Sequence, residues 1–344
     1  MVTMQQIAEA CGVSRGTVDR ALHHKDGVRP EVAARIRETA REMGYISARM
    51  MPQTAKTWRI GVVLHSGSTD FVRQLRGLFE QVAARELLPV DIVVRAMDGV
   101  DIYHQLALID ELVEIEKIDG LALMPLANTL IRDKINELSE QKGIPVVTFN
   151  TDIADANRIA YVGPDNIASG RSAAAMLGLV MGRRGRVLPI LGQRSGHYAD
   201  SQRLTGFLAE MTDSFPDIEV LRPECSFLDD ALAERITLRA IQSDPDLNGI
   251  YISSVGRSGV YRAICKSGCA ERIHVVVHDA TPDNLEMVRR GIVDFAIGQD
   301  AQMQGTLPIR MLYNALGHHR LPENRIHTTE ITIKFRCNLL DADI

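Results

Sequence analysis

From residue 59 onward, short apolar runs alternate with helical patterns along almost the whole chain. Most of the runs are continuously apolar, as in parallel strands that are covered on both faces. The intervening helical patterns include Phe71–Glu86, Ile102–Lys117 and Ala231–Ser243, and the alternation predicts repeated βαβ units. The candidate strands are Ile60–His65, Val90–Ala96, Gly120–Leu126, Ile144–Asn150, Arg186–Leu191, Val220–Pro223, Gly249–Ser254, His274–Asp279, Phe295–Gln299 and Thr328–Phe335.

These strands are too many for one sheet of this kind. We therefore predict an α/β fold with two doubly wound parallel-sheet subdomains within residues 59–344. The first subdomain is expected at about 59–162 and the second at about 163–292, and the C-terminal segments are expected to cross back between them.

Residues 1–45 have a different pattern, that of two short helices joined by a tight turn. Thr3 followed by Gln6 is a capping-box pattern, and Gly12 permits a sharp turn because it takes positive φ at no steric cost. Ser14 is a good N-cap for the second helix. A third helix is expected from Pro30 to about Met43, before Gly44.

The second helix of this region carries arginines near its start, while Val18 and Leu22 point inward. This is the layout of a helix-turn-helix, in which the second helix enters the DNA major groove. Arginine suits the O6 and N7 atoms of guanine. The outward candidates for DNA contact are Ser14, Arg15, Gly16, Thr17 and Arg20.

The charge distribution agrees with a DNA contact at one end of the chain. The net charge of the whole chain is −5, but residues 1–57 carry nine Lys/Arg against six Asp/Glu. No apolar run is long enough to span a membrane, and the polar start lacks the features of a secretory signal. The five cysteines are scattered, and we expect reduced, buried thiols and a cytoplasmic protein.

The N-terminal region resembles the lactose-repressor (LacI) family of bacterial transcription regulators. The resemblance is carried by Ile7-Ala8, Gly12-Val13-Ser14, Thr17-Val18, Arg20, Val28 and Gly44-Tyr45-Ile46. It implies that Arg15, Gly16 and Arg20 lie at the base-reading positions, although Gly16 has no side chain with which to read a base.

Residues 46–58 form the linker between the two regions. The resemblance implies a hinge helix here with a leucine wedge in the minor groove, but Thr54 stands at the leucine position and Pro52 interrupts a longer helix. Arg49, Met50 and Met51 are our linker candidates for DNA contact, with a methionine in the role of the wedge.

In open α/β sheets, ligands bind beyond the carboxyl ends of the strands, and polar residues stand there in this chain. The region also resembles the ribose-binding-protein type of periplasmic binding fold, through I-G-V-V, P-V-V-T-F-N, V-G-P-D-N, R-L-T-G-F and V-H-D-A-T-P-D-N. That resemblance implies sugar contacts from Asn150, Arg203, Asp279 and Gln299. Together the two observations give the effector-binding candidates Ser68, Asp70, Phe71, Asn150, Asp152, Arg203, Ser254, Asp279 and Gln299.

One basic group among several carboxylates favours a neutral sugar or polyol as the effector. Phe71 is the candidate to stack on a sugar ring, and Phe227 is a weaker one. No dinucleotide fingerprint, phosphate loop or nucleophile elbow is present. We therefore expect no catalytic residue, no cofactor and no metal.

The sequence thus predicts a DNA-binding transcription regulator, most simply a repressor, that is controlled by a small sugar or polyol. A homodimer is expected, because one head reads only half of a palindromic operator. Two alternatives stay open: a sugar-binding protein of a transport system, and a carbohydrate-modifying enzyme on the same α/β body.

Overall fold

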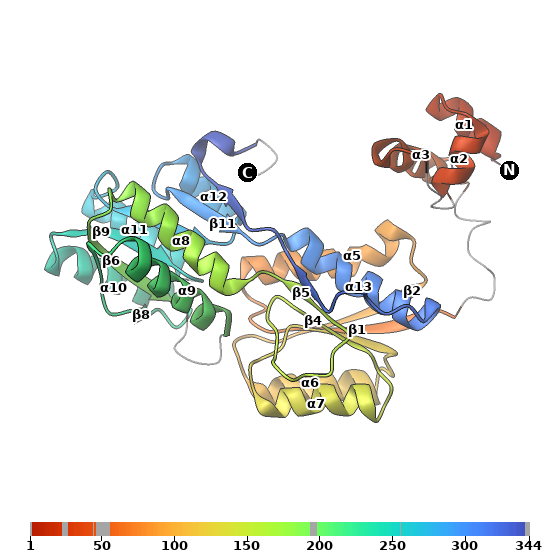
Figure 1. Cartoon of the computed structure of the whole chain (residues 1–344), viewed down its shortest axis with the longest axis horizontal. Helices are drawn as coiled ribbons and strands as arrows, with labels where there is room; N and C mark the ends of the chain where they lie inside the picture. The colour runs from red at the N-terminus through yellow and green to blue at the C-terminus, as the bar shows by residue number, and fades with distance from the viewer. Residues whose placement is uncertain are drawn as a thin grey trace. The chain divides into compact units, whose positions relative to one another are not determined.

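The computed structural model of the protein describes residues 2–22, 27–43, 45, 56–192, 198–254 and 256–340. The chain divides into two compact units, a head (Met1–Thr57) and a body (Trp58–Ile344) (Figure 1).

The head contains α1 (Met4–Cys11), α2 (Arg15–Leu22) and α3 (Pro30–Glu42). The predicted capping box is present: the Thr3 side chain accepts from Gln6 N–H, and Thr3 N–H donates to Gln6 Oε1 at 2.9 Å. Gly12 ends α1 with a left-handed φ of 62°, as the turn requires. The three helices enclose a small apolar core of Ile7, Ala8, Cys11, Val18, Ala21, Leu22, Ala33, Ile36, Ala40 and Tyr45.

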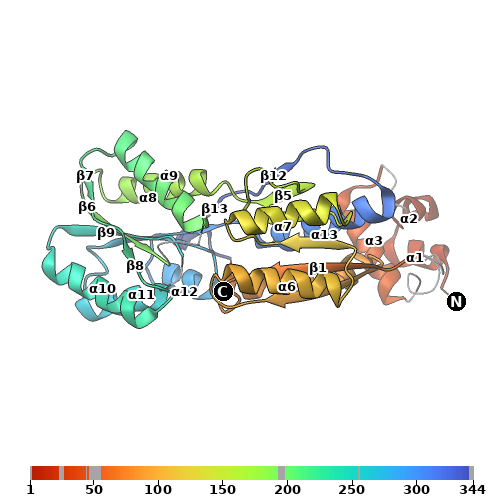
Figure 2. The same cartoon turned by 90° about the horizontal axis from the view of Figure 1, so that it is seen from below.

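The body consists of two lobes. The N-lobe is built on a parallel sheet in the order β12-β5-β4-β3-β1-β2, and helices cover both of its faces (Figure 2). Helices α5 and α13 pack side by side over one core, and α6 and α7 cover the other. The elements are β1 (Trp58–Leu64), α5 (Asp70–Glu86), β2 (Val90–Ala96), α6 (Ile102–Glu114), β3 (Gly120–Leu123), α7 (Thr129–Glu140), β4 (Val146–Phe149), β5 (Ala160–Gly163), α13 (Ala301–His318) and β12 (Ile326–Thr328).

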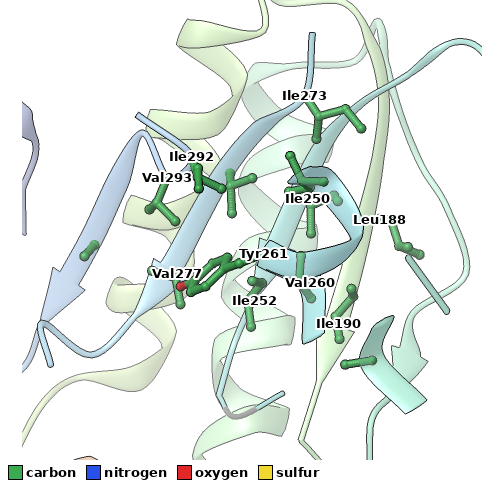
Figure 3. Close-up of a cluster of buried hydrophobic side chains, with 14 of the residues drawn as sticks. Leu188, Ile190, Ile250, Ile252, Val260, Tyr261, Ile273, Val277, Ile292 and Val293 are labelled. Carbon is green, nitrogen blue, oxygen red and sulfur yellow. The ribbon is translucent and has the colours of Figure 1, made fainter. Parts of the chain in front are cut away.

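The C-lobe is built on the sheet β13-β11-β10-β9-β6-β7, with β8 paired to β6 and β13 antiparallel to β11. Figure 3 shows one of its cores, where Val260 and Tyr261 of α11 pack over Ile250 and Ile252 of β9. The elements are α8 (Asn166–Val180), β6 (Gly185–Leu191), α9 (Tyr198–Ser214), β7 (Ile218–Val220), β8 (Glu224–Cys225), α10 (Asp230–Ser243), β9 (Leu247–Ile252), α11 (Arg257–Ser267), β10 (His274–His278), α12 (Pro282–Arg289), β11 (Phe295–Gly298), β13 (Thr332–Lys334) and the 3-10 turn Arg336–Asn338.

The chain passes between the lobes after β5, after β11 and after β12. The α/β class and the two parallel-sheet subdomains predicted from the sequence are confirmed. The second lobe extends past residue 292, because β11 belongs to its sheet. The predicted strand Thr328–Phe335 is wrong: β12 ends in the N-lobe sheet at Thr328, and β13 begins in the C-lobe sheet at Thr332.

Smaller differences have local causes. The predicted strand Val220–Pro223 is wrong: β7 ends at Val220, and the separate strand β8 begins at Glu224, after Pro223, which has no N–H for a sheet ladder. The cysteines are all free thiols, as predicted, but only Cys11 and Cys225 are buried, whereas Cys265 and Cys337 are exposed.

Candidate functional site

A small cavity lies where the two lobes of the body meet. The space in it that is open to the centres of water molecules is about 30 Å³, enough for one or two waters. Both lobes contribute to its walls, and the polar lining residues other than Arg203, which lies on α9, stand at or just after the carboxyl ends of strands. The cavity is lined by Ser66, Thr69, Phe71, Val72, Met124, Asn150, Ala199, Arg203, Leu228, Ser254, Asp279 and Gln299.

Six of the nine effector-site candidates therefore come together at this cavity: Phe71, Asn150, Arg203, Ser254, Asp279 and Gln299. The topology explains their convergence, because β1 and β4 are parallel in one sheet and β9, β10 and β11 are parallel in the other. Parallel strands place their carboxyl ends at one edge of the sheet, where ligands bind in open α/β folds.

The backbone turns sharply at several of these strand ends. Ser66 after β1, Asn150 after β4 and Asp279 after β10 have left-handed φ values of 55°, 63° and 72°. Side-chain-bearing residues adopt this region rarely, Asn and Asp most readily, and such residues cluster at functional sites. The conformation directs polar groups at the cavity instead of continuing the strand.

Asn150 links the two lobes through its amide. Its Nδ2 donates to Gln299 Oε1 and to Gln304 Oε1, both at 3.0 Å. Asn150 belongs to the N-lobe at the end of β4, Gln299 follows β11 of the C-lobe, and Gln304 lies in the first turn of α13. The start of α13, where the chain has crossed back from the C-lobe, is thus bonded directly to the cavity residue Asn150.

Arg203, on α9, is only 4% exposed. Its guanidinium donates from Nε to Asn166 Oδ1 at 3.0 Å, from Nη1 to the Ser253 carbonyl at 2.8 Å and from Nη2 to Gln299 Oε1 at 3.3 Å. Among the described residues, no carboxylate forms an ion pair with it. Its charge is therefore held by neutral acceptors at the junction of both lobes.

The carboxylate of Asp279 accepts hydrogen bonds from two donors. Arg257 Nη1 donates to its Oδ2 at 3.3 Å, and Gln299 Nε2 donates to its Oδ1 at 2.5 Å. Arg257 is the first residue of α11 and is 7% exposed. A buried charge is costly without a partner, so this pair keeps the Asp279 carboxylate in place beside the cavity.

The remaining three effector-site candidates lie outside the lining. Ser68 is exposed, Asp70 is paired with Arg73, and Asp152 is paired with Arg158 and accepts from Thr148 Oγ1 at 2.7 Å. Both carboxylates are thus neutralised locally. Phe227 is 58% exposed, and its neighbour Leu228 lines the cavity instead.

Sequence reasoning missed the residues that hold the lining side chains. Asn166 belongs to the V-G-P-D-N pattern but is not among the effector-site candidates, yet its amide bonds both Arg203 and the Asn150 carbonyl. Gln304 and Arg257 carried no motif. What the three residues share is their position in the first turn of a helix. Each of these helices follows either a strand that ends at the cavity or a segment that crosses between the lobes.

A buried histidine directly precedes the cavity residue Asp279 in the chain. His278 ends β10, and its Nε2 shares a hydrogen bond of 2.9 Å with the Tyr251 hydroxyl. Burial lowers the pKa of His278 well below its ordinary value, and the positive charges of Arg203 and Arg257 add to this. Burial likewise raises the pKa of Tyr251, so both groups are uncharged at neutral pH.

In the head, α2 presents the predicted DNA-contact residues on its outer face. Arg15, Gly16 and Arg20 are exposed, while Val18 and Leu22 are buried. Ser14 Oγ accepts from Thr17 N–H at 3.1 Å and shares a hydrogen bond of 2.8 Å with Thr17 Oγ1, so both fix the start of the helix. Arg49, Met50 and Met51 lie outside the described residues.

Two further findings concern the residues that the structure describes. No group of three or more His, Cys, Asp or Glu side chains among them is arranged to hold a metal ion. No helix in that part of the chain is long and apolar enough to cross a membrane.

Comparison with known proteins matches both units. The family model of the periplasmic binding protein domain matches residues 60–319, and that of the bacterial regulatory proteins of the lacI family matches residues 3–47. The transcriptional regulator MalR of Streptococcus pneumoniae is 24% identical over 278 residues, which cover 77% of this chain and 80% of MalR.

Transport proteins match the body. The ribose import binding protein RbsB of Haemophilus influenzae is 25% identical over 190 residues, 55% of this chain and 63% of RbsB. The crystal structure of GanP, a glucose-galactose binding protein from Geobacillus stearothermophilus, has a TM-score of 0.74 at 21% identity and covers 83% of this chain and 99% of GanP.

A helix-turn-helix head joined to a periplasmic-binding-protein body defines a class of bacterial regulators. The chain belongs to the periplasmic binding protein domain family through its body and carries a DNA-binding domain of the lacI family of bacterial regulatory proteins at its N-terminal end. It is a DNA-binding transcription regulator.

Proposed function

We propose that this regulator is a repressor whose affinity for a palindromic operator is controlled by a neutral sugar or polyol bound in the cavity of the body. The observation that carries the proposal is the convergence of Asn150, Arg203, Asp279 and Gln299 from both lobes on one cavity. Amide, carboxylate and guanidinium groups suit vicinal hydroxyls, and the Phe71 ring offers an apolar surface for a sugar face.

Charge balance supports a neutral ligand. The buried ionic groups around the cavity are Arg203 and Arg257 against Asp200 and Asp279, while Asp70 and Asp152 are paired elsewhere. His278 is uncharged. Among the described residues, the site therefore has no surplus charge to offset a phosphate or a sugar acid, for which buried and unpaired cations would be needed.

The relatives point to the same ligand class. RbsB is a ribose import protein, and GanP is a glucose-galactose binding protein. The helix-turn-helix head distinguishes this chain from RbsB and GanP, because a DNA-binding helix serves transcription regulation and plays no part in sugar transport. We place the ligand in the role of an effector and expect two copies of the chain to bind the two halves of the operator.

The test is a thermal-shift screen with D-ribose, D-xylose, D-glucose, D-galactose and xylitol, followed by an operator gel shift with each ligand that binds. A ligand at 100 times its dissociation constant is expected to add about 2.7 kcal/mol of stability. Gln299→Ala should abolish the shift, because Gln299 bonds Asn150, Arg203 and Asp279.

Ser68→Ala is the matched control, because Ser68 follows β1 but lies outside the cavity lining. It should bind the ligand as the wild type does. A sugar that binds equally well to the wild type and to Gln299→Ala would contradict the proposed site, and a bound sugar that leaves operator affinity unchanged would contradict the proposed control.

A further inference from the structure

The turn between β8 and α10 has a backbone conformation that its residues disfavour. Asp229 N–H donates to the Ser226 carbonyl at 2.9 Å, and the two residues between them, Phe227 and Leu228, have left-handed φ values of 51° and 63°. Two successive left-handed residues are the pattern of a type I′ turn, which Gly, Asn and Asp dominate. Bulky side chains are outliers in this region, so the turn is strained at both central positions.

Both ends of this turn are fixed by hydrogen bonds. Ser226 is fully buried, and its N–H and Oγ both donate to the Leu191 carbonyl, at 2.9 and 3.2 Å. Asp229 is the N-cap of α10, where its Oδ1 accepts from the N–H groups of Ala231 and Leu232 at 2.7 and 3.0 Å. The surrounding structure thus imposes the strained conformation, as it does at ligand clamps in other proteins.

The two central side chains have different surroundings. Phe227 is 58% exposed and is not part of the cavity lining, whereas Leu228 lines the cavity. Leu228 Cδ2 reaches Gly192 after β6, where an added Cβ would be 3.2 Å from it. Asparagine or glycine at position 228 would relieve the strain. A leucine at this position therefore costs stability, and what it adds to the cavity is an apolar side chain.

Leu228 belongs to an apolar part of the cavity lining to which both lobes contribute. A ligand hydroxyl group that faces such side chains loses its hydrogen bonds to water and gains none in return, which is unfavourable. A methyl group in the same place gains contact with them. The apolar lining residues are Phe71, Val72 and Met124 of the N-lobe and Ala199 and Leu228 of the C-lobe.

We infer that Leu228 is a specificity-determining residue and that the effector is a neutral deoxy sugar, whose methyl group contacts Leu228. The inference rests on the proposed function and specifies the class of sugar. The hydroxyl groups of the sugar bind the polar lining residues, such as Asn150 and Asp279, and the methyl group replaces the hydroxymethyl group that Leu228 could not hydrogen-bond.

The experiment measures dissociation constants by isothermal titration calorimetry of the full-length protein with matched pairs of sugars. The pairs are L-fucose with L-galactose, L-rhamnose with L-mannose, and D-fucose with D-galactose. Within each pair the two sugars differ only in a methyl against a hydroxymethyl group. The deoxy sugar of at least one pair should bind about 10- to 100-fold more tightly than its partner.

Leu228→Asn tests the residue itself. Asparagine accepts the left-handed conformation and offers an amide to a hydroxyl group, so this variant should bind the two sugars of the selected pair with nearly equal affinity. Phe227→Asn is the matched control, because it relieves strain in the same turn but changes an exposed side chain outside the lining. It should raise the melting temperature and keep the affinity ratio of the wild type.

The outcomes separate this inference from the proposed function. Binding of fully hydroxylated sugars alone, equal affinities within every pair, or an unchanged ratio in Leu228→Asn would refute the inference and leave a sugar-controlled regulator standing. Failure of every sugar to bind, deoxy or fully hydroxylated, would refute the proposed function together with the inference. Melting temperatures of the two variants show that each is folded.

Discussion

The two candidate sites of this protein hold their arginines in opposite ways. Arg20 in the head is exposed, with one hydrogen bond to its own helix. Arg203 in the body is buried, with hydrogen bonds to three residues from different elements. A base-reading side chain has to stay available to an external partner, whereas a cavity side chain is also part of the packing. Replacing Arg20 should therefore change DNA binding without changing the stability of the head. Replacing Arg203 should change both ligand binding and the stability of the body.

The largest contrast is expected from replacing each arginine by alanine. Arg203→Ala leaves Asn166, Ser253 and Gln299 with lost hydrogen bonds, and we expect it to lower the free energy of unfolding of the body by about 3 kcal/mol. Arg20→Ala is a surface change and should stay within about 0.5 kcal/mol while it abolishes most specific DNA binding. Urea unfolding and gel shifts measure both quantities. Equal destabilisation by the two changes would contradict the contrast.

A glycine in the body tests the packing behind Arg203 without touching the cavity. Gly170 on α8 faces the backbone of α9 so closely that a Cβ there would be 2.0 Å from the Arg203 carbonyl oxygen. Gly170→Ala must push α8 and α9 apart, and we expect a loss of about 2 kcal/mol together with weaker ligand binding.

Gly77→Ala, on α5 of the body, is the control, because a Cβ at Gly77 would meet no atom within 4 Å. The better helix former should then give a small gain in stability. If Gly170→Ala unfolded at the same urea concentration as Gly77→Ala, the close helix contact would be wrong.

The body should also lose stability in mild acid through His278. Its pKa is well below the ordinary value in the folded state, so below about pH 6.5 the unfolded chain binds a proton that the folded chain does not. Stability is then lost as the pH falls, by about 1 kcal/mol between pH 7 and pH 5.5. In His278→Gln this contribution should be absent.

The comparison with the variant is needed because His274 acts in the opposite direction. Its hydrogen bond to Asp294 raises its pKa, which adds stability at low pH that disappears as the pH rises. An identical dependence of stability on pH in the wild type and in His278→Gln would contradict the proposed state of His278.

The sequence predicted the strand-end residues of the cavity well, because apolar strands and the polar residues after them are local signals. It assigned Asp70 and Asp152 to the site because it could not show that Arg73 and Arg158 neutralise them. Asn166, Arg257 and Gln304 were missed, since their roles arise from contacts between segments far apart in the sequence. The division of Thr328–Phe335 between two sheets was missed for the same reason.

The most direct test of ligand control measures operator affinity with and without a sugar that binds the body, in the wild type and in Gln299→Ala. The wild type should change its operator dissociation constant by roughly 5- to 150-fold, the range of typical couplings between sites, and Gln299→Ala should bind the operator but not respond. An operator affinity that stays constant when the sugar occupies the wild-type protein, or a full response in Gln299→Ala, would contradict control through this cavity.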